Sequence, residues 1–262
     1  MKKSPAVIFM FLFVAPLILS AGCAPLIKSI PSEPVTFSRA DEIISGIKAQ
    51  NDMIRSFYSL GIVSIKGWML DSDADILIAG VRDPLTLKIE ITHTWGRPVL
   101  HILLRDGKIQ VLSFQEKQIY SGIFTPEALS RFLPGLSMDR EMIWSILSGR
   151  PPVVSHDALG VSGTDRIQLY DETGLELEAV YLPLEGSFPK KVVLPAQYLN
   201  ISFSDIRENS EIPYAGEIQL SGERLEKDLT LRIKNTVLNA SVPDLIFTLE
   251  IPSNYIAVDL DQ

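Results

Sequence analysis

Alternating apolar and polar positions dominate most of the chain and predict β-strands. Beyond residue 60, apolar side chains recur at every second position, as at Leu87, Ile89 and Ile91. This period of two is typical of a strand with one buried face. Short turn sequences such as Asp106-Gly107 separate the runs, so successive strands are expected to pair antiparallel. The expected strands are residues 60–68, 75–81, 85–92, 99–104, 108–114, 118–120, 166–170, 175–182, 191–194, 198–206, 214–221, 225–238 and 245–251.

Three segments carry the helical period instead. Residues 39–58 place apolar side chains mostly three or four positions apart, with polar residues between them, which predicts an amphipathic helix. Thr125-Pro126 is a good start for a second helix that ends before Pro134-Gly135. Asp139 begins a third helix, which Gly149 and Pro151 end.

The expected fold is mainly β. Roughly a dozen antiparallel strands in one sheet must curl, close or split, so we expect a strongly curved sheet or unclosed β-barrel. The three helices are then expected to pack in or over its concave face, and residues 38–262 to form a single domain. The side chains proposed to line or cover this concave face are Ile47, Ile54, Phe57, Leu129, Phe132, Ile143, Trp144 and Leu147.

The N-terminal segment has the three parts of a secretory signal peptide. Lys2 and Lys3 precede an apolar run at residues 6–19, and small residues follow it up to Cys23. The apolar run is too short for a comfortable membrane span. We therefore expect residues 1–22 to be removed during export.

Cys23 is the only cysteine of the chain, so it has no partner for an internal disulfide. The run Leu19-Ser20-Ala21-Gly22-Cys23 resembles the lipobox of bacterial lipoproteins, which implies cleavage before Cys23 and a diacylglycerol on its thiol. An ordinary signal peptide with an incidental cysteine is the alternative. Residues 23–37, rich in proline, then read as a lipidated tether. The resemblance also favours the outer membrane, because position 24 is not the aspartate that retains lipoproteins of enteric-type bacteria in the inner membrane.

The charge balance excludes a nucleic-acid partner. The full chain has a net charge of −8, and removing residues 1–22 takes away two lysines and leaves −10. Phosphate contacts need clustered Lys and Arg, and the sequence has no basic cluster. Attachment to a membrane must therefore come from the lipid anchor, and two or more acyl chains hold stably.

A catalytic set is missing from the sequence. His93, His101 and His156 are not spaced as metal ligands. Gly160-Val-Ser162-Gly163 lacks the last position of a nucleophile elbow, and there is no phosphate-binding glycine loop. We expect no enzyme activity, no metal and no cofactor.

The order of motifs between Leu60 and Pro152 resembles LolB, the outer-membrane receptor of the LolA/LolB lipoprotein-localisation superfamily. The resemblance lies in the apolar strand Leu85–Thr92, the turn before Gly96, the strand Pro98-Val-Leu-His-Ile-Leu-Leu, and two short motifs that follow. These are Arg105-Asp106-Gly107-Lys108 and Leu147-Ser148-Gly149-Arg150-Pro151. The chain continues well beyond the usual end of LolB. Because of this longer C-terminal part, the resemblance does not determine which lipoprotein or lipid the protein would carry.

The resemblance implies an unclosed barrel whose apolar interior takes the acyl chains of lipoproteins or phospholipids from a periplasmic LolA-like carrier. It also implies a protruding turn that delivers the client, here Trp95 and Gly96. An exposed Trp suits a membrane interface, although Trp95 could equally fold back as a core plug. The expected place is the outer membrane, with the domain facing the periplasm and its anchor in the inner leaflet. The alternative function is a non-catalytic envelope-assembly scaffold with a filled core.

Overall fold

A computed structural model describes residues 35–65, 73–133, 136–184, 186–223, 225 and 228–261. Every described residue belongs to one compact unit, Glu33–Gln262. This unit has its own sheet, helices and core, which is what a domain needs to fold alone. The expected signal peptide 1–22, Cys23 and all but the last three residues of the expected tether lie outside the described residues.

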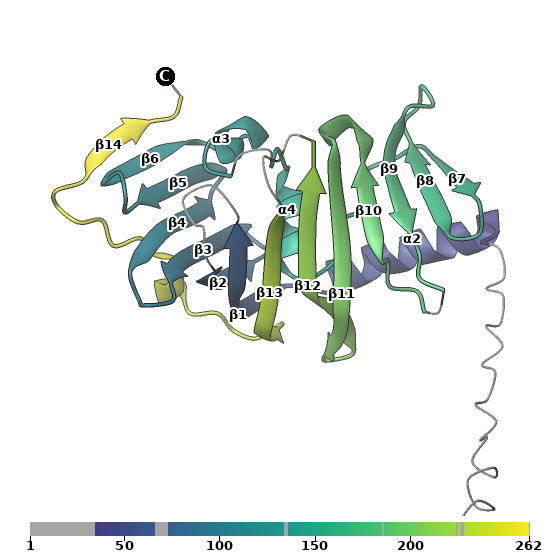
Figure 1. Ribbon diagram of the computed structural model, residues 1–262, viewed down its shortest axis with the longest axis horizontal. Coiled ribbons are helices and arrows are strands. Elements are labelled where there is room, and N and C mark those ends of the chain that lie inside the picture. Colours follow the sequence, from purple (N-terminus) through teal and green to yellow (C-terminus); the bar gives the residue numbers. More distant parts are fainter. Residues whose placement is uncertain are drawn as a thin grey trace, which may run out of the picture. The chain divides into compact units, whose positions relative to one another are not determined.

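Fourteen strands in the described part of the chain form one sheet (Figure 1). The strands are β1 (Ser56–Ile65), β2 (Asp73–Val81), β3 (Thr86–His93), β4 (Pro98–Arg105), β5 (Lys108–Ser113), β6 (Gln118–Ile123), β7 (Ala158–Ser162), β8 (Arg166–Tyr170), β9 (Glu176–Tyr181), β10 (Lys191–Leu194), β11 (Leu199–Asn209), β12 (Ile212–Gly222), β13 (Leu229–Leu238) and β14 (Ile256–Asp259). The helices are α2 (Phe37–Asp52), α3 (Pro126–Ser130) and α4 (Arg140–Leu147), with 3-10 turns η2 (Pro195–Gln197) and η3 (Asp244–Phe247).

The sheet consists of two antiparallel meanders joined side by side. Its order is β14-β6-β5-β4-β3-β2-β1-β13-β12-β11-β10-β9-β8-β7, so β1 and β13 join the first meander to the second through long-range pairing. The edge strands β14 and β7 are not neighbours, and the barrel is unclosed. The expected fold is confirmed in this respect. One pair differs from the expected antiparallel pattern, because β14 runs parallel to β6.

The helices cover one face of the sheet, which we call the inner face. In Figure 1, α2 crosses behind β9, β10 and β11, and α4 lies behind β12 and β13. The N-cap of α2 is Thr36, whose hydroxyl accepts a hydrogen bond from the Arg39 N–H at 3.3 Å. Ile43, Ile44 and Ile47 of α2 are buried in the same core cluster as the inner-face residues of the strands. Burial of this apolar stripe, more than helix propensity, stabilises the helix.

The C-terminal segment crosses the other, outer face of the first meander. Phe247 of η3 is buried there against Ala79 of β2 and Leu103 of β4, in a small core cluster of its own. The Lys88 ammonium donates to the Thr248 carbonyl at 2.7 Å and pairs with Glu90 at 2.6 Å. We call residues 239–261 the C-terminal strap, since they run from the end of β13 over this face to β14.

The structure corrects three sequence predictions. The helix expected at 39–58 ends at Asp52, so Ile54 lies between elements and Phe57 lies on β1. The strand expected at 245–251 is the 3-10 turn η3 followed by chain without regular structure, and β7 and β14 were not predicted. Position 57 satisfies the helical period, but pairing with Leu238 and Gly80 on both sides places it in the sheet.

Candidate functional site

An apolar cavity lies between the inner face of the sheet and the helices α3 and α4. Its volume is about 80 Å³. The lining consists of Val63, Ile76, Leu87, Ile89, Ile91, Ile102, Leu104, Leu129, Leu133, Leu136, Met138, Ile143, Ile146, Leu147, Leu220, Leu229 and Leu231.

Alternation along the strands places the sheet side of this lining. Leu87, Ile89 and Ile91 are alternate residues of β3, so their side chains point to the same face. Ile89 lies opposite Ile102 of β4, and Leu87 lies opposite Leu104. Such cross-strand aliphatic pairs form a continuous apolar floor.

The helix side of the lining comes from α3, α4 and the chain between them. Both helices begin with a side-chain cap: Thr125 accepts from the Ala128 N–H at 3.1 Å, and Asp139 accepts from the Met142 N–H at 2.8 Å. These caps fix where each short helix starts. They thereby direct Leu129 and Ile143 toward the strands.

The cavity is suited to binding hydrocarbon and to no polar chemistry. Every lining side chain is aliphatic or methionine, so attraction for a ligand comes from apolar burial without hydrogen-bond recognition. Among the residues that the structure describes, no three His, Cys, Asp or Glu side chains are grouped to hold a metal ion.

The structure brings three of the proposed cavity residues together and separates the others. Leu129, Ile143 and Leu147 line the cavity. The other five are buried but do not line it: Ile47, Ile54, Phe57, Phe132 and Trp144.

Each of the three buried aromatic residues from this group packs against another ring. Phe132 contacts Tyr120, with ring centroids 4.9 Å apart. Trp144 contacts Phe57 at 4.8 Å and lies under the Arg82 guanidinium at 5.4 Å. These rings complete the core around the cavity.

Sequence reasoning named only helix residues and missed the floor of the cavity. Ile89, Ile102 and Leu231 come from three strands and line it. Their even spacing with neighbouring apolar residues marked them as one buried face, but the unfilled space depends on how far the helices stand from the sheet.

The turn between β3 and β4 exposes Trp95 to solvent. Its side chain is 70% exposed, and its ring stacks on that of His93 with centroids 4.3 Å apart. The turn is closed by the Gly96 N–H, which donates to the His93 carbonyl at 2.7 Å, and Gly96 has a positive φ of 86° that favours glycine. The alternative that Trp95 fills the core is wrong.

The motif Leu147–Pro151 holds a buried cation. Arg150 is 1% exposed and donates to Asn51 Oδ1 at 2.9 Å, to Gln50 Oε1 at 2.6 Å and to the Pro213 carbonyl. The Phe188 ring lies 5.1 Å from its guanidinium. Burial lowers the pKa of Arg150 to about 10, so the group is charged at neutral pH.

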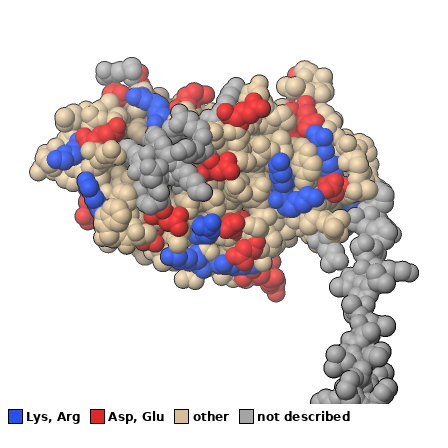
Figure 2. Space-filling view, viewed as in Figure 1, with Lys and Arg blue, Asp and Glu red and all other residues tan. Residues whose placement is uncertain are grey.

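The charges on the surface are mixed. On the face seen in Figure 2, acidic and basic residues are interspersed and do not form a single-sign patch. No helix in the described part of the chain is long and apolar enough to cross a membrane.

No protein-family model matches this sequence, and no curated protein matches it significantly. Among solved structures, a DUF1329 family protein from Desulfovibrio piger is similar in fold, with a TM-score of 0.51 and 11% identity over 82% of this chain and 98% of that one. A LolA superfamily protein from Nitrosomonas europaea matches at a TM-score of 0.44 and 11% identity, over 79% and 97% of the two chains. The lipoprotein LppX from Mycobacterium tuberculosis matches at 0.35 and 11%, over 79% and 99%. The last two likenesses are too distant to carry weight, and the first shows the fold alone.

Proposed function

We propose that this chain is a lipid-anchored protein of the outer membrane that accepts acyl chains in its apolar cavity and releases them into the membrane. The observation that carries the proposal is the unfilled cavity of about 80 Å³, whose lining is entirely apolar. An apolar cavity offers water no polar partner, so it stays dry and free for an apolar ligand. A scaffold with a filled core has no need of such a space.

Transfer along this route requires no nucleotide. Burying one methylene group is worth about 0.8 kcal/mol, so small differences in cavity depth decide which protein holds a long chain. A periplasmic carrier of the LolA type is the donor in this scheme, and the acyl chains belong to lipoproteins or phospholipids.

Binding is tested with a fluorescent acyl probe and residues 24–262. Val63→Phe places a larger side chain in the cavity from β1, whereas Val237→Phe makes the same change at a half-exposed position of β13. We expect V63F to weaken probe binding about tenfold, or by about 1.4 kcal/mol, and V237F to leave it unchanged. Absence of probe uptake by the unchanged protein would refute the acyl-binding proposal and favour the scaffold.

Release is proposed to use Trp95 at the membrane interface, because its amphipathic ring is exposed at a turn. Trp95→Ser is expected to leave acyl binding and Tm unchanged and to slow transfer of a labelled acyl ligand to phospholipid vesicles about tenfold. Leu245→Ser is the control, since Leu245 is 80% exposed on the C-terminal strap. Equal transfer rates for the two variants would contradict a special role for Trp95.

Anchoring is proposed to depend on Cys23 and two or more acyl chains. Cys23→Ala is expected to move the protein from the membrane fraction to the soluble periplasmic fraction of the host. A variant that stays in the membrane would show that another feature holds it.

A further inference from the structure

A second cleft lies between α2 and the connection from β9 to β10. Its volume is about 210 Å³, and it shares no lining residue with the apolar cavity. Its lining includes two cations, Arg39 and Arg150, and one acid, Glu42. The cleft is therefore positive, in a chain whose net charge is negative.

The cation at the base of this cleft has no counter-charge. All three hydrogen-bond acceptors of Arg150 are neutral, since they are an amide oxygen of Asn51, another of Gln50 and the carbonyl of Pro213. No carboxylate among the described residues pairs with it. A guanidinium has five N–H donors, so two of them are left by these three bonds. Burying an unpaired charge is costly, and a bound anion compensates for it.

The walls of the cleft leave room for a ligand. Gly46 lies inside α2, where glycine disfavours the helix, and a Cβ added there meets nothing within 4 Å. Its missing side chain keeps the cleft open along the helix. Arg39 lies two turns before Gly46 on the same face of α2. It pairs with Glu42 at 3.2 Å, with both side chains more than 60% exposed. Such a surface pair is weak, so Arg39 is available to an incoming anion.

We propose that this cleft binds a phosphate group, with Arg150 supplying the buried charge and Arg39 a second cation at the mouth. The planar fork of a guanidinium matches phosphate oxygens, and the Ser187 hydroxyl in the lining adds a donor. The phosphate comes from a lipid headgroup or from a soluble phosphate ester. The site does not rest on the acyl-binding function, although a headgroup source would extend it to anionic lipids.

The test measures Tm of residues 24–262 in inorganic phosphate and in chloride at equal ionic strength. At ten times the dissociation constant, bound phosphate is expected to raise Tm by about 3–6 °C. Gly46→Phe adds a ring beside the cleft at a position where a Cβ meets nothing within 4 Å, and it is expected to remove most of this rise. Ser45→Phe is the matched control, because Ser45 is the exposed neighbour outside the cleft.

Two further variants probe the cations. Arg39→Gln changes an exposed residue and is expected to weaken phosphate binding about threefold to tenfold. Arg150→Lys keeps the charge but loses the fork, and it is expected to weaken binding further. If R150K does not fold, G46F and R39Q still show whether the cleft binds phosphate. A Tm rise that is absent, or equal in G46F, S45F and the unchanged protein, overturns the proposal.

Two kinds of probe show whether the phosphate group belongs to a soluble ester or to a lipid headgroup. The first is glycerol 3-phosphate, and the second is a vesicle of phosphatidylglycerol or phosphatidylcholine. Stabilisation by glycerol 3-phosphate that G46F abolishes supports a soluble ester. Preference for phosphatidylglycerol vesicles that G46F abolishes, without that stabilisation, supports a headgroup. Uptake of the acyl probe is expected to be equal in G46F and S45F, so failure of this site is distinguishable from failure of the acyl-binding function.

Discussion

At the scale of single residues, Glu178 has the least favourable environment for a charge. It is completely buried on β9, where the Val154 N–H donates to its Oε2 at 2.8 Å and its Oε1 has no partner. Burial raises the pKa of this carboxyl to about 8, although the hydrogen bond from Val154 acts in the opposite direction. The folded protein therefore holds a neutral Glu178 at pH 7.

This pKa predicts how stability depends on pH. The carboxyl of Glu178 has a pKa near 4.5 in the unfolded chain. Its contribution to the free energy of unfolding is therefore fully present below pH 4.5 and is lost as pH rises through about 8. We expect the free energy of unfolding to fall by roughly 1 kcal/mol per pH unit between pH 5 and 8. Glu178→Gln should remove this slope, whereas Glu172→Gln in the exposed β8–β9 turn should keep it. Urea titrations at each pH measure it, and parallel profiles for E178Q and the unchanged protein would contradict the prediction.

Gly149 is required where the chain after α4 meets β12. Its φ is +82°, a Cβ there would meet the Tyr214 Cβ at 3.0 Å, and its carbonyl accepts from the Ala215 N–H at 2.8 Å. Gly149→Ala is expected to lower the free energy of unfolding by about 2–4 kcal/mol, from the disfavoured φ and the close approach together. Gly163→Ala, with φ +69° and open space around it, should cost about 1 kcal/mol. Chemical denaturation compares the two, and equal losses would show that the close approach is unimportant.

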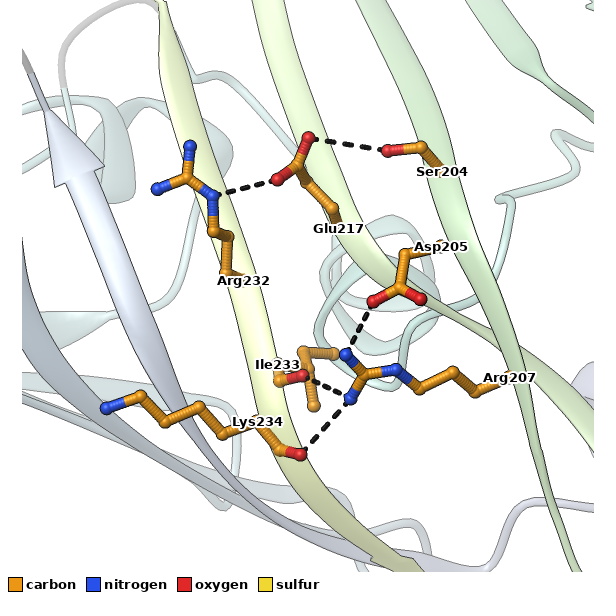
Figure 3. A network of polar contacts seen from close by, with 7 residues as sticks. All are labelled: Ser204, Asp205, Arg207, Glu217, Arg232, Ile233 and Lys234. Carbon is orange, nitrogen blue, oxygen red and sulfur yellow. Dashed lines mark hydrogen bonds and ion pairs between the residues drawn. The ribbon is translucent and has the colours of Figure 1, made fainter.

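At the scale of elements, β12 and β13 are paired over only part of their length. Their ladder covers Glu217–Leu220 against Leu229–Arg232. Beyond it, the Ala215 N–H of β12 donates to the Gly149 carbonyl. Side chains from β11 reach the β13 backbone there. Figure 3 shows the Arg207 guanidinium contacting the carbonyls of Ile233 and Lys234, at 2.9 and 3.1 Å, and the carboxylate of Asp205.

Arg207 should therefore matter more than other surface arginines. Arg207→Ala leaves two strand carbonyls without their donor, and we expect a loss of about 1–2 kcal/mol in the free energy of unfolding. The control is Arg232→Ala, which removes the exposed ion pair with Glu217 at 2.8 Å and should cost about 0–1 kcal/mol. A larger loss for R232A than for R207A would contradict this account of the gap between the strands.

At the scale of the whole Glu33–Gln262 unit, the C-terminal strap connects the end of the second meander to the first. It places Phe247 over β2 and β4 and ends as β14 beside β6. Part of the outer face is thereby covered as well as the inner one, which the sequence pattern of a one-sided sheet does not predict.

The strap is expected to contribute to the stability of the first meander. Phe247→Ala should lower the free energy of unfolding by about 2–4 kcal/mol, because Phe247 is 4% exposed and loses its burial. Leu245→Ala, in the same 3-10 turn but 80% exposed, should change it by less than about 0.5 kcal/mol. Hydrogen exchange of β2 and β4 should rise in F247A only, and unchanged exchange would show that the strap is dispensable.

The sequence by itself determined most of the local elements of this protein and the faces that they bury. Leu87, Ile89 and Ile91 had to share one side of a strand because side chains alternate, and Thr125 and Asp139 marked two helix starts because their oxygens satisfy free N–H groups. These features depend on neighbours within a few residues, and the mainly β character of the fold follows from them.

Only the tertiary structure decided the features that depend on distant parts of the chain. Phe57 belongs to a strand because β13 and β2 pair with it on either side, and β14 exists because it reaches β6 across more than 130 residues of sequence. The cavity and the cleft of Arg150 are spaces between elements, set by the distance at which helices pack on the sheet. Periodicity fixes which side chain faces inward, but it contains no information about how completely the interior is filled.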